Sequence, residues 1–87
     1  MNIKIHGKVR YIGKQTKIDS DKGTHSFKII VIETLEDSYI AIHCWDGTQE
    51  IVKDLKLESI VNLNCRLESH RNRKNKDLWY HKVLLVS

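Results

Sequence analysis

Apolar and polar residues alternate along most of the chain, a period of two that is typical of β-strands with one buried face. The expected strands are residues 2–12, 27–34, 39–45, 60–69 and 78–86. In the first strand the apolar residues share one face, which we expect to be buried. They are Ile3, Ile5, Val9 and Tyr11. Gly7 lies within this strand and predicts a bulge or a sharp bend, as where a barrel strand turns a corner.

The second expected strand is apolar on both faces, unlike the others. Phe27, Ile29 and Val31 alternate with Ile30 and Ile32. A strand of this kind is covered on both sides, by the core, a ligand or a second subunit. A barrel this small buries only one face internally, so the pattern predicts a homo-oligomer, a dimer or a tetramer, or a ligand on the other face.

The segments between these strands are of three kinds. Residues 13–24 are polar with a turn-forming sequence at 19–23, and we expect a long exposed loop. Residues 70–76 are expected to form an exposed hairpin loop. After Trp45, Thr48 can cap a short helix whose apolar residues recur at helical spacing. These are Ile51, Val52, Leu55 and Leu57.

The order of these elements predicts the fold. Three strands, a helix and two strands within 87 residues describe one domain, residues 1–87, of the all-β class: a five-stranded OB-fold barrel with one short helix between strands 3 and 4. A short SH3-like barrel is the alternative, and the helix disfavours it.

The net charge of +4 is modest, but the cations are concentrated at the two ends of the chain, while residues 32–58 are acidic. In an OB barrel the loop after the first strand and the last hairpin flank the ligand-binding face. Those two loops are basic here, which predicts a groove for a polyanion. The alternative interpretation of these cations is that they lie on solvated strand faces that are rich in lysine and bind no ligand. The candidate cations are Lys14, Lys17, Lys22, Lys28, Arg71, Arg73, Lys74 and Lys76.

Single-stranded nucleic acid also requires flat side chains on which bases stack. Trp45, at the end of the third strand, is a candidate, although tryptophan also closes barrel ends. Trp79 and Tyr80 follow the basic hairpin and fall on opposite faces, so either could face the groove. We expect Phe27 to belong to the core.

Catalysis has little support in the sequence. The five histidines lack metal-ligand spacing, and no phosphate-binding loop or nucleophile motif occurs, so we expect no enzyme, no metal and no cofactor. Cys44 and Cys65 form no C-x-x-C pair and are expected in the core; a disulfide between them conflicts with a reducing compartment. No apolar run is long enough to span a bilayer, so we expect a cytoplasmic protein without membrane contact.

Three segments resemble the bacterial single-stranded-DNA-binding protein superfamily. Ile5-His6-Gly7-Lys8-Val9 resembles its opening strand. Its passage from the third strand to the helix resembles Ile40-Ala41-Ile42-His43-Cys44-Trp45 followed by Gly47 and Gln49-Glu50-Ile51-Val52. Its last hairpin resembles Leu67-Glu68-Ser69, before a charged loop, together with Trp79-Tyr80. The resemblance implies single-stranded DNA as ligand, a homodimer or homotetramer, and a role in DNA replication, recombination or repair. The chain stops at Ser87 without the acidic-tipped tail of the replicative proteins, so the resemblance is closest to small tailless or primosomal-accessory-like OB domains.

That family usually has a glycine between the helix and the fourth strand. Leu57-Glu58-Ser59 stands there instead, so this turn must be made differently. We therefore expect sequence-independent binding of single-stranded DNA in an OB groove. Two alternatives stay open: binding of single-stranded RNA, and a protein-interaction OB module that serves as an accessory subunit of a replication or mobile-element complex.

Overall fold

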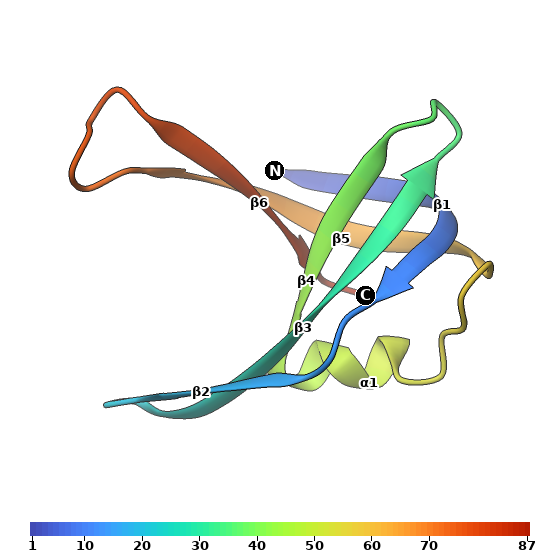
Figure 1. Ribbon diagram of the computed structural model, residues 1–87, viewed down its shortest axis with the longest axis horizontal. Helices are drawn as coiled ribbons and strands as arrows, with labels where there is room; N and C mark the ends of the chain where they lie inside the picture. The colour runs from blue at the N-terminus through green and yellow to red at the C-terminus, as the bar shows by residue number, and fades with distance from the viewer.

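The computed structural model describes residues 1–87 and consists mainly of β-strands (Figure 1). All five expected strands are present, and the third has the expected bounds. One additional strand occurs in the segment expected to be a loop. The elements are β1 (Asn2–Ile12), β2 (Thr16–Ser20), β3 (Gly23–Thr34), β4 (Tyr39–Trp45), a 3₁₀ turn (Asp46–Thr48), α1 (Gln49–Val52), β5 (Ile60–Arg71) and β6 (Trp79–Leu85).

The sheet closes on itself. The strands follow the order β1-β5-β6-β4-β3-β2, and an additional pairing of β1 with β3 completes the ring. All pairs are antiparallel except β4 with β6, which run parallel where Ile42 meets Val83 and His43 meets Leu84. This arrangement is the predicted five-stranded OB-fold barrel, with its helix between barrel strands β4 and β5. Neither helical segment is long and apolar enough to cross a bilayer.

The prediction of a long exposed loop at residues 13–24 is wrong, because most of this segment belongs to the β2–β3 hairpin. β2 pairs with the first half of β3 from Thr16 opposite Phe27 to Ser20 opposite Gly23. The chain reverses through a two-residue turn, and Gly23 follows it with φ 119°, a conformation that glycine adopts without steric cost. The Thr24 hydroxyl donates a hydrogen bond of 2.8 Å to Asp19 Oδ1 across the hairpin. The segment is therefore an ordered arm that extends beyond the barrel (Figure 1).

The core lies inside the ring and consists of aliphatic side chains and two thiols. Ile30 and Ile32 are fully buried in it, so the outer face of β3 carries Phe27, Ile29 and Val31 instead. Both faces are apolar in sequence, and the interaction-module alternative placed Ile30 and Ile32 on the outer face; their burial shows that this assignment was wrong. Cys44 and Cys65 are buried and free, as expected of small core residues.

Gly7 marks the corner at which β1 leaves one neighbour for the next. It pairs with Val61 of β5 and also with Thr34 of β3. A Cβ atom at this position would collide with the carbonyl oxygen of Glu33. Gly7 thus permits close approach of two backbones, and the expected bend is present here.

The bulge of β1 lies three residues further on. Val9 pairs with Ile32, but the next partner, Val31, pairs with Tyr11, so Arg10 is the extra residue. A bulge of one residue reverses the faces of the residues that follow it. Tyr11 therefore lies on the outer face and is 56% exposed, which corrects its expected place in the core.

The expected helix is shorter than predicted and begins differently. A 3₁₀ turn precedes α1, so Thr48 already has helical φ and ψ and donates its hydroxyl hydrogen bond back to the Trp45 carbonyl instead of capping α1. Val52 is buried in the core, whereas Ile51 is exposed. After α1, Glu58 adopts φ 73°, a left-handed conformation that favours glycine, so this turn is made without one.

Candidate nucleic-acid interface

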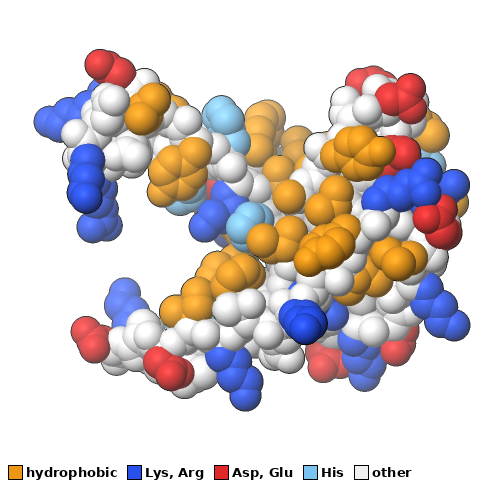
Figure 2. All heavy atoms as spheres, viewed as in Figure 1, with side chains coloured by type: hydrophobic (Ala, Val, Ile, Leu, Met, Phe, Trp, Pro, Cys, Tyr) orange, Lys and Arg blue, Asp and Glu red, His pale blue; other side chains and the backbone are white.

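Two hairpins extend from the same side of the barrel, β2–β3 and β5–β6 (Figure 1). Figure 2 shows a deep notch between them, with hydrophobic and histidine side chains along its floor and Lys and Arg side chains on both arms. They contain the two basic segments, residues 13–24 and 70–76, whose charge predicted a binding groove. We call this notch the groove, and its floor is the outer face of β3 and β4.

The β5–β6 hairpin extends outward because its two strands lose their other partners. β5 pairs with β1 only up to Arg66, and β6 meets β4 only at Val83 and Leu84. Beyond these positions the two strands pair only with each other, as far as Arg71 opposite Trp79. Asn72 closes the tip, because its Oδ1 accepts hydrogen bonds from the backbone N–H groups of Lys74 and Asn75 at 2.8 and 3.0 Å.

Asp46 fastens the base of the β2–β3 hairpin to the end of β4. Its Oδ1 accepts a hydrogen bond of 3.0 Å from the Ser26 backbone N–H, and its Oδ2 lies 3.1 Å from His25 Nδ1. The Ser26 bond, and then the His25 bond, lower the pKa of Asp46. Gln49 Nε2 donates a further hydrogen bond of 2.9 Å to the Ser26 hydroxyl. The arm is thus held at its base.

None of the predicted cations forms an ion pair with a carboxylate, so their charge is available to a ligand. Arg73, Lys74 and Lys76 lie at the tip of the β5–β6 hairpin, where Asp77 is the acidic neighbour. Arg71 lies on β5 instead of in the loop: its Nε donates a hydrogen bond of 2.7 Å to the Lys76 carbonyl. The β2–β3 arm is less basic, because it also contains two aspartates.

Three flat side chains lie together on the groove floor. Phe27 of β3 pairs with Trp45 of β4, with ring centroids 4.7 Å apart, and the His43 ring is 6.3 Å from Phe27 with an angle of 21° between planes. All three are partly buried, so their orientation is fixed while their outer surface stays accessible. Phe27 belongs to this surface and not to the core, which corrects the expectation.

The parallel pairing of β4 with β6 decides which aromatic of the β5–β6 hairpin shares the groove face. His43 pairs with Leu84, and alternation then places Lys82 and Tyr80 on the same face as His43. Tyr80 stacks on His70, with ring centroids 5.5 Å apart. Trp79 lies on the opposite face, where the Arg71 guanidinium is 5.4 Å from its ring centroid.

His43 has an altered pKa. Partial burial lowers the pKa of His43 below its ordinary value, and the positive charge of Lys82 lowers it further. The imidazole of the free protein therefore takes up a proton less readily than an ordinary histidine. An anion placed between His43 and Lys82 would offset the charge of Lys82 and favour the protonated imidazole.

The structure does not place all candidate cations on the groove face. Lys28 pairs with the buried Cys44, and Lys17 pairs with Ser26, so both belong to the opposite face of the β2–β3 arm. Lys22 lies in its terminal turn. Only Lys14 lines a hollow together with aromatic residues, Tyr11 and Phe27.

Sequence reasoning missed three residues of this surface: Tyr11, His43 and Lys82. His43 and Trp45 are two residues apart on one strand, so alternation already placed them on one face. Tyr11 is hidden by the bulge, and the available signal was the break of alternation at Tyr11-Ile12. The place of Lys82 depends on the contact of β6 with β4, which no local pattern encodes.

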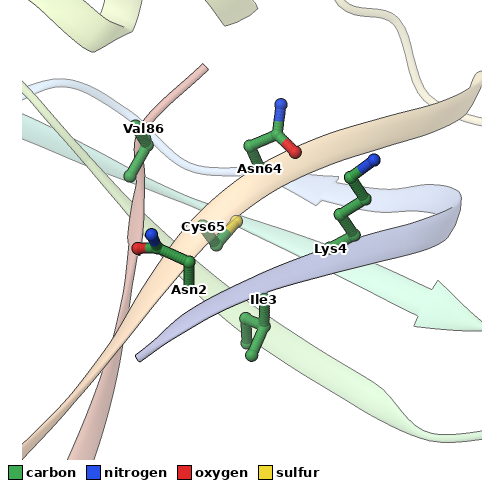
Figure 3. Close-up of a pocket in the computed structure, with 6 residues that line it drawn as sticks. All are labelled: Asn2, Ile3, Lys4, Asn64, Cys65 and Val86. Atoms are coloured by element: carbon green, nitrogen blue, oxygen red, sulfur yellow. The ribbon is translucent and has the colours of Figure 1, made fainter.

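A separate pocket of about 290 Å³ lies on the β1–β5 side of the barrel, beside the C-terminal residues (Figure 3). Ile3, Cys65 and Val86 line it together with Asn2, Asn64 and the side chain of Lys4. It has no aromatic ring for base stacking and lies on different strands from the groove floor. No group of three or more His, Cys, Asp or Glu residues is arranged to hold a metal ion.

Comparison with known proteins gives no assignment: no protein-family model matches the chain, and neither a curated protein nor a solved structure is significantly similar to it.

Proposed function

We propose that the chain binds single-stranded DNA, with little sequence preference, in the groove between its two hairpins. The observation that supports this best is the ring cluster of Phe27, His43 and Trp45 on the groove floor, with unpaired cations at the tip of the β5–β6 hairpin and with Lys14 where the chain enters the β2–β3 arm. Cations neutralise the phosphates of a single strand, and flat rings stack with any base. No catalytic step is part of this proposal.

The choice of DNA rests on the sequence resemblance, since charge and stacking do not distinguish the two sugars without a contact to the 2′-hydroxyl. Segments 5–9 and 40–45, which carry this resemblance, lie on β1 and β4, and β4 contributes to the groove floor. RNA must therefore be tested as a ligand beside DNA.

The proposed assembly is a homodimer. Two large apolar side chains remain exposed outside the groove: Leu35 and Ile60 are 82% and 61% exposed, and both line a shallow pocket near the β3–β4 turn whose other walls are mostly polar. A second copy would cover this surface. Light scattering at about 50 µM, a concentration suited to a weak interface, should give twice the mass of one chain, and a monomer there would contradict the dimer.

The experiment that tests the function compares three labelled ligands of equal length by fluorescence anisotropy: oligo(dT), oligo(U) and duplex DNA. One stacked base contributes about 1–3 kcal/mol, so oligo(dT) should bind at least roughly tenfold more tightly than duplex. Equal affinity for single strand and duplex would leave only a general basic surface. Preference for oligo(U) would assign the groove to RNA, and binding of none of them would favour the protein-interaction module.

A further inference from the structure

A hollow of about 430 Å³ lies where β1 passes into the β2–β3 hairpin, next to the groove floor. Tyr11, Phe27 and Ile29 give it apolar walls, and Lys14 adds one cation that has no acidic partner. Phe27 also contacts Trp45, so the hollow continues the ring cluster of the floor. A flat apolar wall suits stacking with one base, and the single free cation beside it suits contact with one phosphate.

Gly13 keeps this hollow open. Its backbone N–H donates a hydrogen bond of 2.8 Å to the Ile29 carbonyl. A Cβ atom here would lie 2.9 Å from that carbonyl oxygen and 3.4 Å from a carbon of the Tyr11 ring. A side chain at this position would therefore push the Ile29 backbone away and occupy the space beside the Tyr11 ring.

Tyr11 lines the hollow only because of the bulge at Arg10. Without the extra residue, Tyr11 would share the inward face of Val9, and no aromatic ring would come from β1. The hollow therefore depends on the bulge.

Arg10, the bulged residue, is held by two carboxylates. Its Nη1 donates to both oxygens of Glu58, at 2.7 and 2.8 Å, and its Nε donates to Glu33 Oε1 at 3.1 Å. The Glu33 hydrogen bond, and then the Glu58 hydrogen bond, raise the pKa of Arg10. The backbone adds a second connection, because Glu58 N–H donates to the Val9 carbonyl and Val9 N–H donates to the Ser59 carbonyl, at 2.8 and 2.9 Å.

Glu58 takes part in this contact at a cost in backbone strain. At φ 73° a non-glycine residue is unfavourable, and a glycine would be the relaxed choice. Exposed ion pairs contribute little to stability. The strained backbone of Glu58 is thus kept for an ion pair that adds little stability, which indicates that the pair serves to fix the geometry of the bulge.

We infer that the hollow is a subsite for a single nucleobase, which stacks on Tyr11 while its phosphate contacts Lys14, and that Arg10 and Glu58 are positioning residues that keep Tyr11 outward. This inference rests on the proposed function and specifies one base-binding site within it.

The first test replaces the ring. Tyr11→Ala should weaken oligo(dT) binding about fivefold or more, without a change in the salt dependence, whereas Tyr11→Phe should bind like the parent. Lys14→Ala should instead reduce the slope of log K against log salt by about 0.7. The comparison is Tyr39→Ala: this tyrosine is 66% exposed on the same face of β4 but at its far end, opposite Glu33, and does not line the hollow, so its loss should weaken binding less than loss of Tyr11. A Tyr11→Ala variant that binds like the parent overturns the subsite.

The second test separates positioning from plain stability. Arg10→Gln should weaken oligo(dT) binding when Tyr11 is present, and should have no further effect on affinity in the Tyr11→Ala background. A residue that only stabilises the barrel would lower the melting temperature and weaken binding to the same extent in both backgrounds. Additive effects in this double-mutant cycle therefore overturn the positioning role.

A third measurement distinguishes failure of the subsite from failure of the proposed function. Thymidine monophosphate at millimolar concentration should shift the NMR signals of the Tyr11 ring and the Gly13 amide, and inorganic phosphate alone should not shift the ring. If the parent binds oligo(dT) but these signals do not move, the subsite is wrong and the function stands. If the signals move without oligo(dT) binding, the subsite stands and the proposed function is wrong. If neither occurs, both are wrong.

Discussion

Phe27 and Trp45 face each other across β3 and β4, with ring centroids 4.7 Å apart and an angle of 31° between the planes. Each ring limits the motion of the other, so the pair forms a preorganised surface on the groove floor. Preorganisation lowers the entropy lost on binding. Trp45 lies in this pair, whereas the second tryptophan, Trp79, stacks with Arg71 on the other face of the β5–β6 hairpin.

The different positions of the two tryptophans lead to a prediction for fluorescence. In Trp79→Phe only Trp45 emits, and saturating oligo(dT) should quench the emission strongly because a base stacks on the ring. In Trp45→Phe only Trp79 emits, and the change should be small. The Trp45→Phe variant should also bind more weakly, with an unchanged salt dependence, because stacking releases no counterions. Stronger quenching of Trp79 than of Trp45 would contradict the proposed groove face.

The corner at Gly7 predicts a large effect on stability. Gly7→Ala places a methyl group against the Glu33 carbonyl oxygen, where β1 meets β3. We expect urea unfolding to show a loss of about 3 kcal/mol or more, or no folding at all. Gly47→Ala is the matched control, because open space surrounds that position and its change should stay within about 0.5 kcal/mol. A Gly7→Ala protein as stable as the parent would contradict the observed register of β1 with β3.

His43 predicts that affinity for oligo(dT) rises as pH falls from about 8 to about 6. Burial and Lys82 lower the pKa of His43 in the free protein, and a bound phosphate would raise it, so binding takes up a proton. His43→Asn should flatten this profile. His6→Gln should leave it unchanged, because His6 lies on β1 and bonds to Asn62 away from the groove. An identical pH profile in parent and His43→Asn would exclude a phosphate at His43.

The same histidine affects the stability of the free protein in the opposite direction. The unfolded chain binds the proton at the ordinary pKa of 6.5, whereas the folded chain binds it only at lower pH. The contribution of neutral His43 to stability is therefore present above pH 6.5 and decreases as pH falls through the lowered folded-state pKa. Thermal unfolding of parent and His43→Asn between about pH 7 and about pH 5 should show the smaller acid sensitivity in the variant.

The two cysteines should be inert in the folded protein. Burial raises the pKa of Cys44 and of Cys65 to about 11, and a thiolate is the reactive form. A colorimetric thiol reagent at about pH 8 should react with neither thiol before urea is added and with both afterwards. Rapid reaction of the native protein would contradict the burial of both thiols in the core.

The sequence predicted those features that follow from local patterns. Strict alternation from Tyr39 to Trp45 was sufficient to give the bounds of β4 and the shared face of His43 and Trp45. The basic hairpins were visible as clusters of charge. The segment Leu57-Glu58-Ser59 contains no glycine, which indicated an unusual turn before β5, and Glu58 with its positive φ lies in that turn.

The features that sequence reasoning missed depend on contacts between distant strands. Because Ile29 and Ile30 are equally apolar, the sequence of β3 alone does not determine which of them points into the core; the pairing of β3 with β1 and β4 does. The outward turn of Tyr11 depends on one bulged residue, which is held by Glu58 nearly fifty positions later in the chain. The groove face of Tyr80 follows from the short parallel contact of β6 with β4, which is defined only when the ring closes.

The central claim, binding of a single strand between the two hairpins, is tested most directly by the salt dependence of oligo(dT) affinity. Arg73, Lys74 and Lys76 are replaced together by Ala, and Arg71 is kept because it closes the hairpin through the Lys76 carbonyl. Each phosphate contact contributes about 0.7 to the slope of log K against log salt, so the triple variant should have a slope flatter by about 2. Lys4→Ala, a cation at the pocket on the β1–β5 side, should leave the slope unchanged. If the triple variant binds oligo(dT) as tightly as the parent at every salt concentration, the hairpin contacts no phosphate and the proposed groove is wrong.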